Sequence, residues 1–334
     1  MNSNTGGSLG GGAIYMTGVT AASPLTISNS TINSNSTTSG GGAGIFLSGV
    51  TNTTTITDTT VNSNTGGSNS YGNGFYAYNA AVTISDGTFN SNTGGANRGG
   101  GGLYIAGDGA LTNSITGTTI NSNETGSVGG GGIYVNLTHA TTKTLTLDKV
   151  KVQGNKATSG GGGGIRIASG DVTISNSLIT GNSVVTAWQY AGGIYNQGTL
   201  NLYYSTIANN YGYRSGGLDC GGIDTIRNNI VYNNVAGWAS GVDEIGGSCD
   251  TNVNNVTTDP TFVTPGTQTT STTAYTDGDF RLSTGSNSVD TGDANNTSDH
   301  DILGNSRPVD LTGYSDGTNE HDIGAYEMQS LPLP

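Results

Sequence analysis

Apolar residues recur in a fixed order along the chain, in segments too short to form helices. Each repeat contains a brief alternation of apolar and polar residues, such as Leu25-Thr26-Ile27, which is typical of a half-buried β-strand. A second apolar position follows, and a third segment opens on a glycine run, as in Gly131-Gly132-Ile133-Tyr134. The glycine-led segment occurs eight times at steps of 24–32 residues, which predicts a stacked repeat protein.

Three short strands in a repeat of this length predict one coil of a parallel β-helix. Successive coils would pair through backbone hydrogen bonds about 4.8 Å apart and form three long sheets around a narrow core. Crossovers between parallel strands are right-handed by default. We therefore expect an all-β, right-handed parallel β-helix of about eight or more three-stranded coils, with an atypical C-terminal cap. The expected domains are the repeats in residues 1–240 and an acidic closing region in residues 241–334, continuous with the helix.

An asparagine closes each repeat at the same phase. Asparagine adopts the left-handed conformation at bends, and its amide can bond the backbone and the equivalent side chain one coil away. We predict an inward-facing ladder with a structural role, formed by Asn35, Asn64, Asn92, Asn123, Asn155, Asn182, Asn210 and Asn234.

Aromatic residues follow the inward position of the glycine-led strand. If Ile14 and its equivalents point inward, the next residue points outward. That position is aromatic in six repeats, as Tyr15, Phe46, Tyr76, Tyr104, Tyr134 and Tyr195. The stripe is a candidate ligand-binding surface, able to stack on sugars or anchor a protein. Alternatively, the rings stabilise a twisted sheet or lie under a corner loop.

Composition and charge restrict the function classes. The chain has 58 glycines and only 10% charged residues, whereas disordered chains have high charge and no periodicity. The net charge of −13 divides into +1 for residues 1–218 and −14 for residues 219–334, which marks a change of construction. Neither part has the basic stripe of a nucleic-acid-binding protein. The sequence has no apolar run long enough to span a membrane and no signal peptide. Its first residues resemble the end of a coil, so we expect a fragment or processed chain.

The acidic end contains a candidate metal site and the only cysteines. Asp290, Asp293, Asp299 and Asp301 lie in a Gly/Asn-rich stretch and offer the oxygen ligands that Ca²⁺ prefers. A solvated acidic loop, or pairing with Arg281 and Arg307, is the alternative. Cys220 and Cys249 are 29 residues apart, about one coil, so they are candidates for a disulfide or for a buried thiol pair.

Catalytic patterns are sparse. Asp58, Asp86 and Asp148 follow strands at places where asparagine also occurs, which indicates turn capping. The three histidines, His139, His300 and His321, are scattered without a metal-protease or triad spacing. We therefore expect a binding protein rather than an enzyme. The alternative is a polysaccharide-degrading enzyme on a pectinase-like β-helix. Ice binding is a third hypothesis, from a Thr-x-Asn row that begins at Thr31/Asn33 and breaks at Lys151/Gln153.

Two motif sets carry a family resemblance. The alternation of Gly11-Gly12-Ala13-Ile14-Tyr15 with Phe89-Asn90-Ser91-Asn92 resembles the repeats of polymorphic outer-membrane proteins, which are surface adhesins and autotransporter passengers. The end, with Asp279-Phe280-Arg281-Leu282 and Asp322-Ile323-Gly324-Ala325-Tyr326-Glu327, is similar to the choice-of-anchor β-helix family of bacterial surface proteins. The resemblance implies a secreted or cell-surface bacterial β-helix and assigns no catalytic residues. We expect an adhesin or structural spacer whose partner is a glycan or a surface protein.

Overall fold

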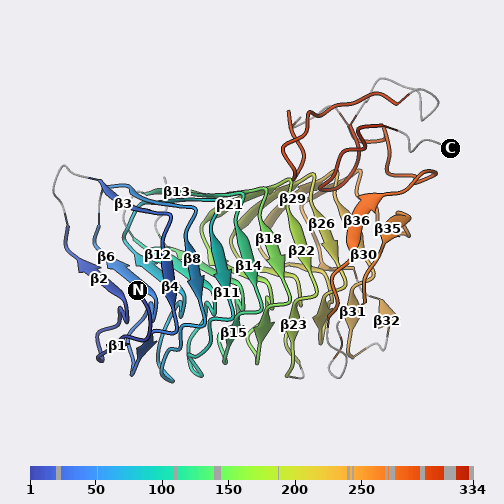
Figure 1. The fold of residues 1–334 in the computed structure, drawn as a ribbon. Helices are drawn as coiled ribbons and strands as arrows, with labels where there is room; N and C mark the ends of the chain where they lie inside the picture. Colours follow the sequence, from blue (N-terminus) through green and yellow to red (C-terminus); the bar gives the residue numbers. More distant parts are fainter. Residues whose placement is uncertain are drawn as a thin grey trace.

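The computed structural model describes residues 1–19, 24–50, 52–108, 111–138, 144–186, 188–238, 241–242, 244–267, 270, 275–293, 298–311 and 321–330. Within these ranges all regular secondary structure is β-strand. Parallel stacked sheets form a β-solenoid of about eight turns (Figure 1). The predicted all-β solenoid is therefore confirmed.

Four stacks of strands surround or flank the core, in the order in which each coil visits them. Sheet 1 contains β2 (Ile14–Thr17), β6 (Ile45–Ser48), β9 (Phe75–Tyr78), β12 (Leu103–Gly107), β16 (Ile133–Leu137), β20 (Ile165–Ser169), β24 (Ile194–Asn196), β28 (Leu218–Cys220) and β33 (Ile245–Gly247). Sheet 2 contains β3 (Leu25–Ser28), β7 (Thr54–Thr57), β10 (Val82–Ser85), β13 (Thr112–Thr116), β17 (Thr144–Asp148), β21 (Asp171–Ser175), β25 (Thr199–Tyr203), β29 (Ile223–Arg227) and β34 (Thr251–Val253).

The third and fourth stacks are built from shorter strands. Sheet 3 contains β4 (Thr31–Asn33), β8 (Thr60–Asn62), β11 (Thr88–Asn90), β14 (Thr119–Asn121), β18 (Lys151–Gln153), β22 (Leu178–Thr180), β26 (Thr206–Ala208) and β30 (Ile230–Tyr232). Sheet 4 contains β15 (Glu124–Thr125), β19 (Lys156–Ala157), β23 (Ser183–Val184), β27 (Tyr211–Gly212), β31 (Val235–Ala236) and β32 (Gly241–Val242), and β1 (Thr5–Gly6) pairs separately with β5 (Ser36–Thr37). The sequence predicted three strands in a coil; the fourth is two residues long, too short to show an alternation.

The core is a column of aliphatic side chains from sheets 1, 2 and 3. Strands pair in parallel with equivalent residues opposite one another, so that Ile84 lies between Ile56 and Ile115 in sheet 2. All three side chains are fully buried. Because each coil adds the same apolar positions to the column, a chain with few hydrophobic residues still fills a continuous core.

Two corners turn through single residues in the left-handed conformation. Between sheets 2 and 3 this residue is Asn29, Asp58, Asp86, Gly117, Lys149, Asn176, Tyr204, Asn228 or Asn254, with φ between 45° and 59°. Asparagine, aspartate and glycine tolerate this conformation best, which explains their frequency here. Asp148 is not part of the row, although we predicted it as a turn cap: it pairs with Ser175 as the last residue of β17.

The predicted asparagine ladder is confirmed at the corner between sheets 3 and 4. All eight side chains are fully buried, and each amide nitrogen donates to the amide oxygen of the next asparagine at 2.9–3.0 Å. The left-handed residue is the one before the ladder asparagine, such as Ser122 before Asn123. The Glu244 carboxylate accepts the bond from Asn234 at 2.6 Å and so ends the ladder.

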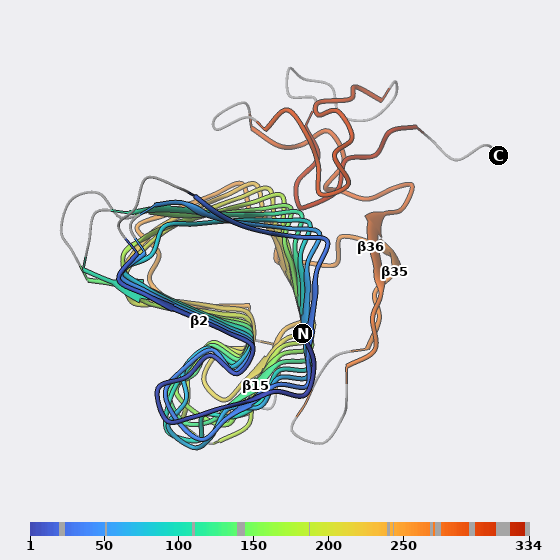
Figure 2. The same ribbon diagram turned by 60° about the vertical axis from the view of Figure 1, so that its left-hand side comes forward.

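The chain beyond Asp259 forms the later part of the region predicted at residues 241–334, and from here on the name closing region is used for this part alone. It packs against the side of the solenoid (Figure 2). Its antiparallel strands β35 (Phe262–Thr264) and β36 (Asp279–Leu282) and the following segments bury apolar side chains against Leu178, Ala208 and Ile230 on the outer face of sheet 3. Over these coils the outward pairs of the Thr-x-Asn row are Leu178/Thr180, Thr206/Ala208 and Ile230/Tyr232, so each pair contains at least one residue with apolar or aromatic surface. Beyond residue 240, β33 and β34 still extend sheets 1 and 2.

Candidate ligand-binding surfaces

The six predicted aromatic residues lie on the outer side of sheet 1. The rings from Tyr15 to Tyr134 form a stacked ladder, with centroids 4.8–5.4 Å apart and planes within 21° of parallel. Arg166 takes the next position, and its guanidinium lies 5.7 Å from the Tyr134 ring centroid and 5.4 Å from the Tyr195 ring centroid. The cation continues the stack where an aromatic residue is missing.

Most of this ladder is covered by the loops that connect sheet 4 to sheet 1, the folded segments between the β15 and β2 labels in Figure 2. Tyr104, Tyr134 and Tyr195 are only 6–7% exposed, while Tyr15 is 46% exposed. A Cβ on Gly99 would approach the Tyr134 ring to 2.7 Å, so glycine is what lets the loop lie directly on the ring. Burial raises the pKa of Tyr76 to about 12.

The covering of the ladder limits which of its rings a ligand could reach. An aromatic ring stacks on a sugar only if its face is open to solvent, and the buried rings at the centre of the ladder are not. Their position agrees with the alternative interpretation, in which the rings lie under a corner loop and hold it to the sheet.

An exposed aromatic ridge lies beside the C-terminal end of the ladder and was missed from the sequence. It consists of Trp188, Tyr213 and Trp238, one residue from each of three consecutive loops. Trp188 is 75% exposed and Trp238 is 64% exposed. The Trp188 and Tyr213 ring centroids are 5.4 Å apart, and the Trp238 backbone N–H donates to the Tyr213 carbonyl at 3.0 Å. The spacing of 25 residues between successive members is the signal that could have revealed the ridge.

Hydrogen bonds and a cation fix the ridge to the solenoid. The Trp238 indole N–H donates to the Arg214 carbonyl at 3.1 Å. The Arg214 guanidinium lies 4.9 Å from the Tyr190 ring centroid, and Tyr190 stacks on Tyr195 at 4.4 Å. Arg214 therefore connects the Trp238 ring to the stacked Tyr190 and Tyr195 rings on sheet 1.

The four aspartates predicted as a calcium site have different partners. Asp293 pairs with Arg227, Asp299 bonds His300, and the Asp301 carboxylate accepts the backbone N–H groups of Leu303 and Asn305. An Asp290 oxygen accepts the Leu311 N–H at 3.1 Å. In the portion of the chain that the structure describes, no group of three His, Cys, Asp or Glu side chains is placed to hold a metal ion. The calcium site stays a prediction without support from this geometry.

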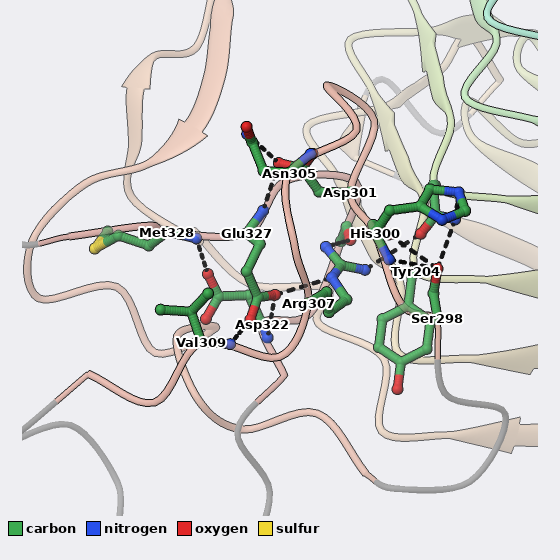
Figure 3. A network of polar contacts seen from close by, with 12 residues as sticks. Tyr204, Ser298, His300, Asp301, Asn305, Arg307, Val309, Asp322, Glu327 and Met328 are labelled. Atoms are coloured by element: carbon green, nitrogen blue, oxygen red, sulfur yellow. Dashed lines mark hydrogen bonds and ion pairs between the residues drawn. The ribbon is translucent and has the colours of Figure 1, made fainter.

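A buried ionic network joins the segments of the closing region (Figure 3). Arg307 donates to the Glu327 carboxylate at 2.9 Å, and both side chains are fully buried. Glu327 also accepts the Asp322 and Val309 N–H groups, and Asp322 accepts the N–H of Asp290. Burial, then the neighbouring Asp322 charge, raises the pKa of Glu327 to about 7, against the opposing effect of Arg307. Burial likewise raises the pKa of Asp322 to about 6. These contacts give the motif Asp322-Ile323-Gly324-Ala325-Tyr326-Glu327 a structural role in the closing region.

The two cysteines form a disulfide. Cys220 ends β28 and Cys249 lies two residues after β33, and their Cα atoms are 5.2 Å apart. The bond links neighbouring coils at the C-terminal end of sheet 1.

Comparisons with family models, with curated proteins and with solved structures find no match. The resemblance to polymorphic outer-membrane proteins and to choice-of-anchor proteins is therefore unsupported beyond the β-helix fold itself. No helix in the described ranges is long and apolar enough to cross a membrane.

Proposed function

We propose that this protein is an extracellular or bacterial cell-surface β-helix that binds a glycan through the exposed ridge of Trp188, Tyr213 and Trp238. The observation that carries the proposal is the exposure of both tryptophans, the only two in the chain. Tryptophan is costly to expose and is normally highly buried, so two exposed rings in neighbouring loops favour a binding role. The disulfide supports an oxidising compartment, where such bonds persist.

A glycan fits the ridge better than a protein partner. A stable protein interface buries about 800 Å² on each side and involves about 20–30 residues with an apolar centre. The ridge offers three rings in a row, and its loops are otherwise rich in Gly, Ser and Thr. A narrow row of rings matches the flat apolar face of pyranose rings along an extended chain.

Intrinsic fluorescence tests the proposal directly, because every tryptophan signal comes from the ridge. Titration with oligosaccharides selected on a glycan array should change the emission of the wild type. The variant W188A/Y213A/W238A should lose binding on the array while keeping its circular dichroism. The variant Y15A/Y78A is the matched control, since it removes two other exposed aromatic side chains, 46% and 38% exposed. Equal binding by the ridge variant and the wild type would exclude the ridge.

A second candidate function, ice binding, is favoured by one observation on sheet 2. Its outward positions form two rows of mainly hydroxyl side chains, namely Thr26, Thr55, Thr83, Ser114, Thr146 and Thr173, with Ser28, Thr57, Ser85, Thr116, Asp148 and Ser175 beside them. Strand pairing repeats these groups about every 4.8 Å. Thermal hysteresis in the wild type, abolished by Thr83→Tyr, would support this function, and its absence would remove it.

The polysaccharide-degrading alternative rests on the fold class alone. Release of reducing ends from a polysaccharide, measured over many hours against heat-inactivated protein, is the test that separates it from binding.

A further inference from the structure

A cleft of about 1020 Å³ separates the outer side of sheet 2 from the closing region. The solenoid contributes Asp148, Ser175 and Tyr203 to its lining, and the closing region contributes Asp299, His300 and His321. The ridge belongs to the loops between sheets 4 and 1, so the cleft is a separate surface of the molecule. Both sides contribute polar side chains, of which only Asp299 was predicted from the sequence as a site residue, in the calcium hypothesis.

His321 is a buried polar side chain in this cleft whose ring has no polar partner among the described residues. It is 6% exposed, and neither ring nitrogen makes a hydrogen bond to that part of the chain. Its ring packs on Tyr204 with centroids 5.6 Å apart. Burial, followed by the Arg307 charge, lowers the pKa of His321, so the imidazole is neutral near pH 7. A neutral imidazole offers one donor and one acceptor, and buried polar groups of this kind normally have partners.

A carboxylate–histidine group forms another part of the lining. His300 Nε2 lies 2.9 Å from Asp148 Oδ2, and His300 Nδ1 lies 2.6 Å from Asp299 Oδ1. Asp148 also accepts bonds from Ser175 and Asn176 at 2.7 and 2.9 Å. His300 therefore bridges the closing region to sheet 2, and the two carboxylates give the cleft an acidic character.

Three features define the ligand chemistry. The carboxylates of Asp148 and Asp299 disfavour an anion, because the Arg307 guanidinium in the same lining is already paired with Glu327. The His321 nitrogens disfavour a purely apolar group. A hydroxyl group both donates and accepts, as the two His321 nitrogens require. The half-buried Tyr203 supplies an aromatic ring in the same lining, a surface on which a pyranose can stack.

We propose that this cleft binds a neutral sugar residue, with His321 bonding its hydroxyl groups and Asp148 and Asp299 accepting further hydroxyl protons. The proposal does not depend on the ridge. The two sites can be lost separately, so failure of one is distinguishable from failure of the other.

Saturation-transfer NMR with neutral hexasaccharides of glucose, mannose and xylose tests the proposal, with hexagalacturonate and inorganic phosphate as anionic comparators. At least one neutral oligosaccharide should bind the wild type and the ridge variant W188A/Y213A/W238A. The variant His321→Phe keeps an aromatic ring on Tyr204 but removes both nitrogens, and it should weaken that binding about tenfold, the equivalent of one lost hydrogen bond.

The His321→Phe variant also has a folding control. Since no group of the described residues bonds the His321 nitrogens, its melting temperature should equal or exceed that of the wild type. Unchanged sugar affinity in His321→Phe would overturn the proposal. So would preferential binding of hexagalacturonate, the absence of signal from every neutral oligosaccharide, or binding to the wild type that the ridge variant loses.

Discussion

At the residue scale, an interior ladder asparagine bonds groups in the coil before its own and in the coil after it. The Asn123 amide donates to the Phe89 carbonyl at 2.8 Å and to the Asn155 side chain, while its oxygen accepts both the backbone N–H and the amide of Asn92. Replacing Asn123 by alanine leaves buried donors and acceptors without hydrogen-bond partners, and each unpaired group costs about 1–3 kcal/mol. We expect a loss of about 3 kcal/mol or more in the free energy of unfolding, measured by urea denaturation.

The matched control for that substitution is Asn97→Ala. Asn97 also donates to an asparagine one coil away, Asn69, but in an exposed pair at 3.0 Å. Water replaces the bond when Asn97 is removed, so stability should change little. Equal effects of the two substitutions would mean that ladder burial does not matter.

The Arg307–Glu327–Asp322 network gives the closing region a pH dependence with a definite sign. The pKa of Glu327 is raised to about 7 and that of Asp322 to about 6, both chiefly by burial, so the folded state holds protons that the unfolded chain releases. The stabilisation is fully present below the ordinary carboxyl pKa and is lost as pH rises through 6–7. Calorimetry should show a higher melting temperature of the closing region at about pH 5 than at about pH 8.

Substitution of Glu327 by glutamine separates this effect from general charge. At about pH 5 the raised pKa leaves Glu327 largely protonated, so the neutral glutamine should change the melting temperature little there. The difference in melting temperature between about pH 5 and about pH 8 should shrink. A full pH dependence in Glu327→Gln would assign the effect to other groups.

Residue roles were predictable from the sequence where a role repeats. The ladder from Asn35 to Asn234 keeps one phase through eight coils, and repetition exposes it. Asp148 was assigned to the wrong role because it lies one residue before the turn position. In its coil Lys149 occupies that position, which Asp58 and Asp86 occupy in theirs. A shift of one residue moves a side chain from the corner to the outer face, and its partner, His300, lies 152 residues away.

At the element scale, the outer face of sheet 3 decides where the closing region binds. Ile230 is 1% exposed, points outward from β30 and lies against Gly324, where a Cβ added to the glycine would be 2.7 Å from the Ile230 side chain. Ile230→Lys places a charge in that contact without altering the solenoid core. Trypsin should then cleave after Arg281 much faster than in the wild type, while the repeats stay protected.

The control for Ile230→Lys is Thr88→Lys in the same outward row. Thr88 lies over an uncovered coil, and the row carries a natural lysine at Lys151. Proteolysis of Thr88→Lys should match the wild type. The sequence shows that the row breaks after Asn121. It does not show that the closing region covers the later coils, because the covering segments are distant in the chain and have no period of their own.

At the scale of the whole molecule, the repeat period was sufficient to predict the solenoid, since each coil contacts mainly its neighbours. The closing region could not be derived in this way. Its contacts with the solenoid join residues that lie many positions apart, as in the bond between Arg307 and Asn176, 131 residues apart. The aromatic stripe was predicted as an outward row with one residue in each of six coils, but its covering depends on loop paths that alternation along a strand does not encode.

The disulfide links two neighbouring coils at the C-terminal end of the solenoid. Cys220–Cys249 closes a segment of 29 residues that contains Trp238, one end of the exposed ridge. In the chain-entropy account, a closure of this length stabilises by about 3–4 kcal/mol. Because the coils of a solenoid interact with nearest neighbours, C220S/C249S should loosen the C-terminal coils first, and tryptophan emission should shift at lower urea than the far-ultraviolet circular dichroism. Coincident transitions at the wild-type midpoint would show that strand pairing alone holds these coils. Separated transitions would show that ridge geometry, and with it the proposed glycan binding, depends on an oxidising environment.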